Sequence, residues 1–153
     1  MLLALSALAA ALVIPAAFAG NGPANKATGD FWYGNLSDAP AHFVFNAQDL
    51  GVSGAKGSVS FDDPVWGSFT ANVVSANVQS GKATFTAKLT SSTYKWANSG
   101  DTITWTVYDG GEGAGAVDSF TYDGATIGGA KDPGTGATQY PATAGNIQVH
   151  YSN

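Results

Sequence analysis

The stretch TITWTVY, residues 102–108, decides the fold class of this 153-residue chain. Ile103, Trp105 and Val107 are apolar, and threonines alternate with them up to Tyr108. Because successive side chains of a β-strand point to opposite faces, this alternation predicts a strand with one buried face and one solvated face. Threonine, valine, isoleucine and the aromatic residues also favour strands over helices. The stretch therefore predicts a strand of an antiparallel sheet.

The same alternation recurs along the chain, and turn-forming pairs such as Ser80-Gly81 and Asp123-Gly124 separate the runs. It shifts phase once, at Val73-Val74, which predicts a β-bulge there. We expect an all-β protein: a single-domain antiparallel β-sandwich or barrel of about seven to eight strands. The apolar residues that alternate in this way are Phe43, Phe45, Val59, Phe61, Phe69, Ala71, Val73, Ala83, Phe85, Ala87, Leu89, Phe120, Tyr122, Ile147, Val149 and Tyr151.

The N-terminus reads as a signal peptide. Residues 1–19 are uncharged and apolar and end in Ala17-Phe18-Ala19, the small-x-small pattern of a cleavage site. The alternative is an uncleaved anchor, which the short run and Pro15 disfavour. We expect a secreted protein, extracellular or periplasmic, with no stable membrane anchor after cleavage. Residues 20–29 then form a flexible leader, and residues 30–153 form the β-sandwich domain. A long loop is expected at 124–145, either without structure or with a short edge strand around Thr138 to Tyr140.

Composition narrows the classes of partner and chemistry. The chain has six lysines, no arginine, no cysteine and a net charge of −5. Nucleic acids and anionic membranes attract basic surfaces, so neither is an expected partner. Disulfides and thiol catalysis are excluded because there is no cysteine.

Several motifs in order resemble a known family. They are GSVSF at 57–61, DTITWTVYD at 101–109, GE at 111–112, DSF at 118–120 and GNIQVH at 145–150. Together, over His42 to His150, they resemble a family of secreted bacterial all-β domains, some described as post-COAP-1-like. That family carries a V-x-D-N-G-E-P-G-x-x-D-x-F hairpin and ends in G-N-I-Q-[IV]-H. The resemblance implies a small secreted bacterial protein, or a module of a larger extracellular one, without catalytic activity. The chain departs from the pattern at Gly110, at Gly113 and by one residue added before Asp118, and these changes loosen any fixed ligand geometry.

The acidic loop DGGEGAGAVD, residues 109–118, has two interpretations. Asp109, Glu112 and Asp118 are candidate ligands of a Ca²⁺ ion, because calcium binds carboxylate and carbonyl oxygens. The spacing does not match an EF-hand loop. The favoured interpretation is structural: Asp109 and Asp118 accept backbone N–H bonds in a hairpin connection, and the glycines permit its tight turns. Apart from this calcium hypothesis, no cofactor is expected.

Aromatic residues give the best binding hypothesis. Trp66, Tyr94 and Trp96 lie near strand ends, where exposed rings stack on sugars. The alternative is that these rings cap the open ends of the sandwich. Trp32 and Tyr33 form part of a Phe-Trp-Tyr-Gly run, and Trp105 is expected in the core.

Catalysis is not expected. No G-x-S-x-G motif is present, the two histidines lie in strand-like alternation, and the acids stand mostly at turns. A Thr-rich sheet face is expected if 82–90 pairs with 102–108, and solvation is preferred there over ice binding. The sequence therefore predicts a non-catalytic secreted β-sandwich module with a structural or binding role, whose partner is a carbohydrate or another extracellular protein. The alternatives are a carbohydrate-binding module that uses loop aromatics and a small secreted hydrolase that uses loop carboxylates.

Overall fold

A computed structural model describes residues 25–34, 39–112, 115–124, 126–127, 130–131 and 139–152. In this part of the chain nine strands form one antiparallel sheet in the order β10-β7-β6-β5-β4-β3-β2-β1-β11, and β8 pairs with β9 separately. A single 3-10 turn, η1 (Gly51–Ser53), connects β2 to β3. The strands are β1 (Asn25–Tyr33), β2 (Ala41–Asp49), β3 (Ala55–Asp63), β4 (Gly67–Gln79), β5 (Lys82–Ser92), β6 (Thr102–Tyr108), β7 (Ser119–Asp123), β8 (Thr126–Ile127), β9 (Ala130–Lys131), β10 (Tyr140–Pro141) and β11 (Ala144–His150).

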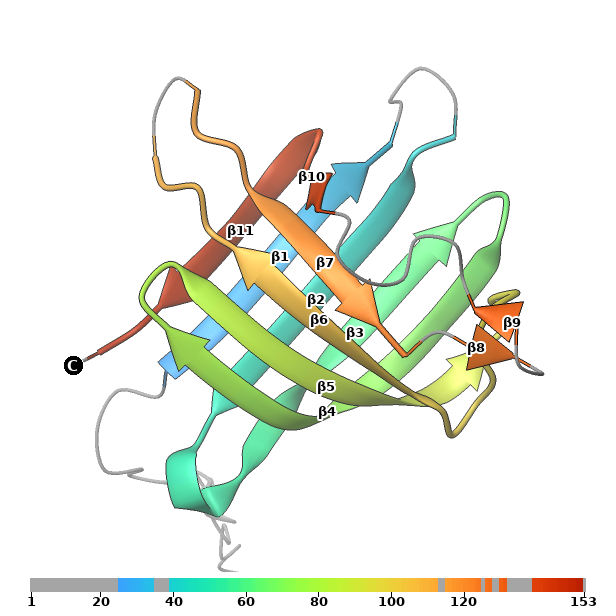
Figure 1. The fold of residues 1–153 in the computed structure, drawn as a ribbon, viewed down its shortest axis with the longest axis horizontal. Helices are drawn as coiled ribbons and strands as arrows, with labels where there is room; N and C mark the ends of the chain where they lie inside the picture. The colour runs from blue at the N-terminus through green and yellow to red at the C-terminus, as the bar shows by residue number, and fades with distance from the viewer. Residues whose placement is uncertain are drawn as a thin grey trace, which may run out of the picture.

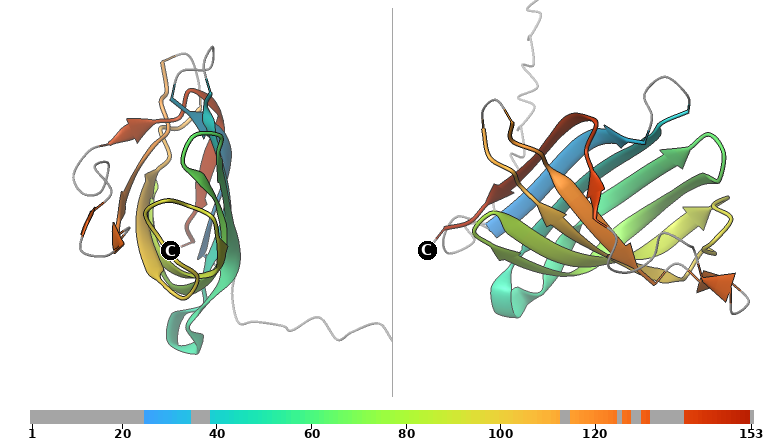
Figure 2. Two further views of the ribbon diagram at one scale, coloured as in Figure 1. Left: turned by 90° about the vertical axis from the view of Figure 1, so that its right-hand side faces the viewer. Right: turned by 45° about the horizontal axis from the view of Figure 1, so that its top comes forward.

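The sheet curls over on itself into a half-barrel, with β1–β3 in one layer and β5–β7 crossing in front of them (Figures 1 and 2). The all-β antiparallel prediction is therefore confirmed. The finer prediction, a sandwich or barrel of seven to eight strands, is replaced by one curled sheet with nine strands among the described residues. Two strands account for the difference: β1, much of which was expected as a flexible leader, and β10, which was expected only as an alternative.

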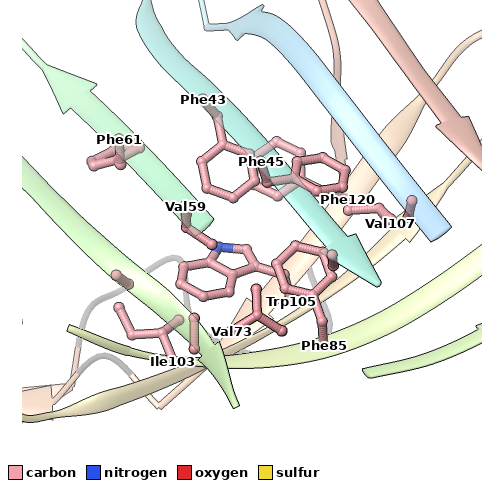
Figure 3. Packing of buried hydrophobic residues seen from close by; sticks show 14 of the residues in the cluster. Phe43, Phe45, Val59, Phe61, Val73, Phe85, Ile103, Trp105, Val107 and Phe120 are labelled. Atoms are coloured by element: carbon pink, nitrogen blue, oxygen red, sulfur yellow. The ribbon is translucent and has the colours of Figure 1, made fainter. Parts of the chain in front are cut away.

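The concave face of the half-barrel holds the core. Alternate residues of each long strand point inward, as the sequence pattern predicts, and aromatic rings join the two layers (Figure 3). Phe45 of β2 stacks on Phe85 of β5 with ring centroids 4.9 Å apart. Phe43 of β2 lies 5.5 Å from Trp105 of β6. Each fully buried large side chain of this kind stabilises the fold by about 1.5–3 kcal/mol relative to exposure.

The phase shift at Val73-Val74 is a β-bulge. The register between β4 and β5 slips between Val73 and Ser75, which confirms the prediction. Val73 is buried, whereas Val74 has 51% of its surface exposed. The extra residue lets Val73 and Val78 both face the core along one strand that bends with the curl of the sheet.

The N-terminal part of the domain differs from the prediction. A flexible leader was expected at 20–29, but β1 begins at Asn25 and pairs with β2 and β11. Gly29 makes β1 difficult to predict from residue propensities, because glycine is rare in strands. Its position on the inner face is filled by Phe45, whose Cε1 lies 2.2 Å from the place that a Cβ on Gly29 would occupy. The expected signal peptide at 1–19 lies outside the described residues.

The segment expected as a long loop at 124–145 contains short strands instead. Tyr140 of β10 pairs with Phe120 of β7 at the edge of the sheet, which confirms at Tyr140 the alternative of a short edge strand around Thr138 to Tyr140. Two residues later the chain joins the opposite edge of the sheet. The N–H of Ala142 donates to the carbonyl of Asp118 at 2.9 Å, and the N–H of Thr143 donates to the carbonyl of Trp32 at 2.8 Å. The chain therefore crosses the opening of the half-barrel at this point.

Candidate functional site

The acidic loop is tied to strand β11 through two carboxylates. Asp118 accepts hydrogen bonds from the N–H of Gly110 at 2.8 Å and from the N–H of Ile147 at 2.5 Å. Asp109 accepts one from the N–H of Gly111 at 2.8 Å and one from the N–H of Val149 at 2.9 Å. Each carboxylate thus uses one oxygen inside its loop and the other on β11. The structural interpretation predicted that these carboxylates accept N–H groups within the loop, and the bonds to Gly110 and Gly111 confirm it. The bonds to Ile147 and Val149 of β11 were not predicted.

The calcium hypothesis places Asp109, Glu112 and Asp118 around one ion. The structure puts Glu112 at an exposed position, while all four oxygens of Asp109 and Asp118 accept backbone N–H groups. Among the described residues, no three side chains of the metal-binding types come together as a set of ligands. A cation here would compete for these oxygens with the N–H groups that join β11 to the loop.

The loop tryptophans meet at one end of the half-barrel. Trp66, in the turn between β3 and β4, lies 6.5 Å from Trp96, in the loop between β5 and β6, measured between ring centroids. The ammonium of Lys95 sits over both rings, 4.7 Å from the centre of Trp66 and 4.9 Å from that of Trp96. The N–H of Lys95 also donates to the carbonyl of Trp66 at 2.8 Å. Lys95 therefore clamps the two loops together through a cation–π contact to each tryptophan.

Tyr94 does not join this pair. It is buried and packs edge-on against Phe61 and Phe69, with centroid distances of 5.3 and 5.7 Å. Of the three aromatic residues proposed for sugar stacking, only Trp66 and Trp96 lie together, and each of their rings already contacts the Lys95 ammonium.

A third tryptophan lies on the convex face of the sheet. Trp32 of β1 stacks on the ring of His42 of β2, with centroids 4.2 Å apart and planes inclined by 11°. The Nε2 of His42 lies 2.7 Å from Oδ1 of Asp30, which is two residues before Trp32 on the same strand. His42 therefore holds both a ring and a carboxylate in fixed positions. On its other side Trp32 is paired in register with Ala144 of β11, a residue with a small side chain.

Next to Trp32 the convex face is hollowed. A shallow depression of about 250 Å³ lies between β1 and β11, lined by Thr28, Gly29, Asp30, Asn146 and Gln148. Register pairs Asp30 with Asn146 and Thr28 with Gln148, so the polar side chains face one another across the two strands. Within the described part of the chain, the side chains of Thr28, Asn146 and Gln148 have no hydrogen-bond partner. We call Thr28, Asp30, Trp32, His42, Asn146 and Gln148 the Trp32 surface.

β11 can approach β1 closely because of a glycine. Gly145 has φ +95°, and a Cβ there would lie 2.2 Å from the carbonyl oxygen of Asp30. Only glycine combines this backbone conformation with such a contact. The glycine of the GNIQVH motif therefore allows Asn146 and Gln148 to line the hollow.

The threonine face predicted for the front layer is present. β5 pairs with β6, and the hydroxyl groups of Thr84 and Thr106 lie 3.0 Å apart. Those of Thr86 and Thr104 lie 2.8 Å apart. These hydroxyls bond to one another across the strands, which supports the interpretation that this face contributes to sheet pairing and solvation.

Comparison with known proteins adds no relative: no family model, no curated protein and no solved structure matches the chain. The family resemblance therefore depends on the short motifs alone. The described residues include no helix with the length and hydropathy of a membrane span.

Proposed function

We propose that this protein is a secreted, non-catalytic module that binds carbohydrate through the Trp32 surface. The observation that supports it most is the combination of an exposed, fixed indole with unpaired polar side chains around a shallow hollow. Sugar rings present an apolar C–H face and a rim of hydroxyl groups. An indole ring offers a matching flat surface, and amides and carboxylates offer hydrogen bonds to hydroxyls in both directions.

Electrostatics and rigidity agree with this proposal. Asp30 accepts hydrogen bonds, whereas Asn146 and Gln148 both donate and accept. His42 fixes Trp32 and Asp30 before any ligand arrives, which lowers the entropic cost of binding. The surface lies on paired strands rather than on loops, and sites on such elements hold their geometry more precisely.

The positions of the carboxylates support the non-catalytic part of the proposal. Asp49, Asp63, Asp101, Asp109 and Asp118 each accept a backbone N–H, mostly in the turn that follows or precedes them. Carboxylates in these positions stabilise turns. In a glycosidase, by contrast, an acid and a second carboxylate face each other across a cleft.

A glycan array probed with Trp32→Ala, Trp66→Ala and the parent protein tests the proposal. The two tryptophans have similar exposure, 39% and 43%, so each variant removes a comparable ring. We expect Trp32→Ala to lose at least about tenfold in affinity, as expected for a central aromatic contact, and Trp66→Ala to bind as the parent does. Loss of binding only in Trp66→Ala would move the site to the loop tryptophans. Equal binding by all three proteins would refute both sites.

A further inference from the structure

A row of outward-facing side chains, most of them polar, extends beyond both ends of the hollow along β1 and β11. On β1 the outward-facing side chains are Lys26, Thr28, Asp30 and Trp32, and their partners on β11 are His150, Gln148, Asn146 and Ala144. From Lys26 to Trp32 the strand rises by six residues, which corresponds to about 20 Å. All of these side chains except the half-buried Thr28 are exposed. The hollow of about 250 Å³ occupies the two middle pairs of this row.

The shape of the row favours a linear ligand. A site for a terminal sugar encloses one ring on several sides, as small-molecule pockets do. Here the hollow is shallow and flanked along the strands by further exposed side chains, with one stacking ring at Trp32 and polar groups repeating at intervals of about 7 Å. A surface of this kind matches successive units of an extended chain better than one ring.

The charges along the row narrow the class of linear ligand. The protein has a net charge of −5, and the side chain of Asp30 at the centre of the row is 73% exposed. A polyanionic chain would meet repulsion at Asp30. A polycationic chain would meet it at Lys26, at the other end of the row. The amides of Asn146 and Gln148 between them suit uncharged hydroxyl groups.

From this placement we infer that the Trp32 surface binds an internal stretch of an uncharged, extended polysaccharide, lying along β1 and β11 from Trp32 toward Lys26. The inference rests on the proposed function and specifies its ligand class: several consecutive neutral sugar units rather than a chain end or an acidic glycan.

The test is isothermal titration calorimetry after a binding screen. The screen uses soluble neutral polysaccharides (glucans, xylan and mannan) and acidic ones (pectate and hyaluronate). Oligosaccharides of one to six units, prepared from the best binder, are then titrated into the parent protein. We expect a neutral polysaccharide to bind best and the affinity to rise at least about tenfold from the disaccharide to the tetrasaccharide.

The far end of the row is tested separately with His150→Ala, because His150 pairs with Lys26 there and does not line the hollow. His150 is exposed, so the variant is expected to fold, and thermal unfolding checks this. We expect it to weaken tetrasaccharide binding about fivefold while disaccharide binding near Trp32 is unchanged. The matched control is Ser58→Ala, an exposed residue on the convex face of β3, which should bind all ligands as the parent does.

The outcomes separate this inference from the proposed function. Equal affinity for short and long oligosaccharides, stronger binding to acidic glycans, or an equal loss for both oligosaccharides in His150→Ala would overturn the extended-chain inference and leave carbohydrate binding intact. Failure to bind any glycan in the array or the screen would overturn the proposed function and this inference with it.

Discussion

The carboxylate of Asp118 accepts a hydrogen bond from the backbone N–H of Ile147 at 2.5 Å, and so joins the acidic loop to the edge strand β11. Two residues further along β11, Asp109 makes the equivalent bond to Val149 at 2.9 Å. Both N–H groups lie on the side of β11 that faces away from β1. A row of unpaired N–H groups on an edge strand can pair with a strand of another molecule and so promote aggregation. Here the carboxylates of Asp109 and Asp118 accept these N–H groups in place of a neighbouring strand, and they join β11 to the acidic loop across the opening of the half-barrel.

Replacing Asp118 with asparagine should destabilise the fold. The amide has nearly the shape of the carboxylate, but it has one acceptor oxygen where two N–H groups need one each. One of the bonds to Gly110 or Ile147 is lost, and the cost for a partly buried, charge-assisted bond is about 2 kcal/mol. Urea unfolding of Asp118→Asn and the parent protein measures this difference.

Glu112→Gln is the matched control for Asp118→Asn. It removes a negative charge from the same loop at an exposed position, and we expect a change in unfolding free energy within about 0.5 kcal/mol. If Asp118→Asn were as stable as the parent, or if the two variants were equally destabilised, the bond to β11 would not contribute to closure.

Calcium should leave the melting temperature of the protein unchanged. A ligand stabilises a protein when it binds the native state more tightly than the unfolded state. The oxygens of Asp109 and Asp118 already accept four backbone N–H groups, so an ion would compete with these groups for the same oxygens, and Glu112 lies exposed rather than facing them as a third ligand. Differential scanning fluorimetry with calcium and with chelator makes the comparison. A rise with calcium that disappears in Glu112→Gln would instead establish the calcium site at Asp109, Glu112 and Asp118.

Much of the fold was predictable because the alternation of side chains directly reports burial on a half-buried sheet. The inward residues of β2 to β6 follow the pattern, and the bulge at Val73-Val74 was visible as a change of phase. β1 was missed over 25–29 because its small residues carry a weak signal. In the fold, Phe45 from the next strand occupies the space that a side chain at Gly29 would need.

The Trp32 surface could not be assembled from the sequence. Its two halves come from opposite ends of the chain, and the pairing of Asp30 with Asn146 depends on how the sheet closes. Alternation does place Trp32 opposite Phe31 and Tyr33, which was a usable sign that its ring faces outward. The partners of Asp109 and Asp118 on β11 were hidden for the same reason, although their roles within the turn were predictable.

Gly29→Ala should destabilise the protein although it adds a single methyl group. The new Cβ would lie 2.2 Å from Cε1 of Phe45, so the phenyl ring must leave its place in the core. Overpacking of this kind costs about 1–3 kcal/mol. Urea unfolding detects it, and Ser60→Ala, an exposed change on β3, serves as the control. If Gly29→Ala were as stable as the parent, Phe45 could move aside without cost, and the prediction of overpacking would be wrong.

The Lys95 clamp should contribute to the stability of the loops. A double-mutant cycle with Lys95→Met and Trp66→Leu measures the coupling between the ammonium and the ring, since both replacements keep apolar bulk. We expect a favourable coupling of about 0.5–1 kcal/mol, typical of an exposed cation–π pair. Zero coupling would indicate that the contact between the Lys95 ammonium and the Trp66 ring does not stabilise the protein.

His42 should support carbohydrate binding by positioning Trp32 and Asp30. His42→Ala removes both the stacked ring and the bond to Asp30, so both side chains must be ordered when the ligand binds. This cost corresponds to about a fivefold loss of affinity. His42→Phe keeps a ring beneath Trp32 and loses only the bond to Asp30, so its loss should be smaller. Calorimetry with the neutral oligosaccharide that binds best gives the affinities, and Trp indole fluorescence of the free proteins reports whether the stack is kept. If both variants bound as tightly as the parent, the contacts of His42 with Trp32 and Asp30 would have no part in recognition.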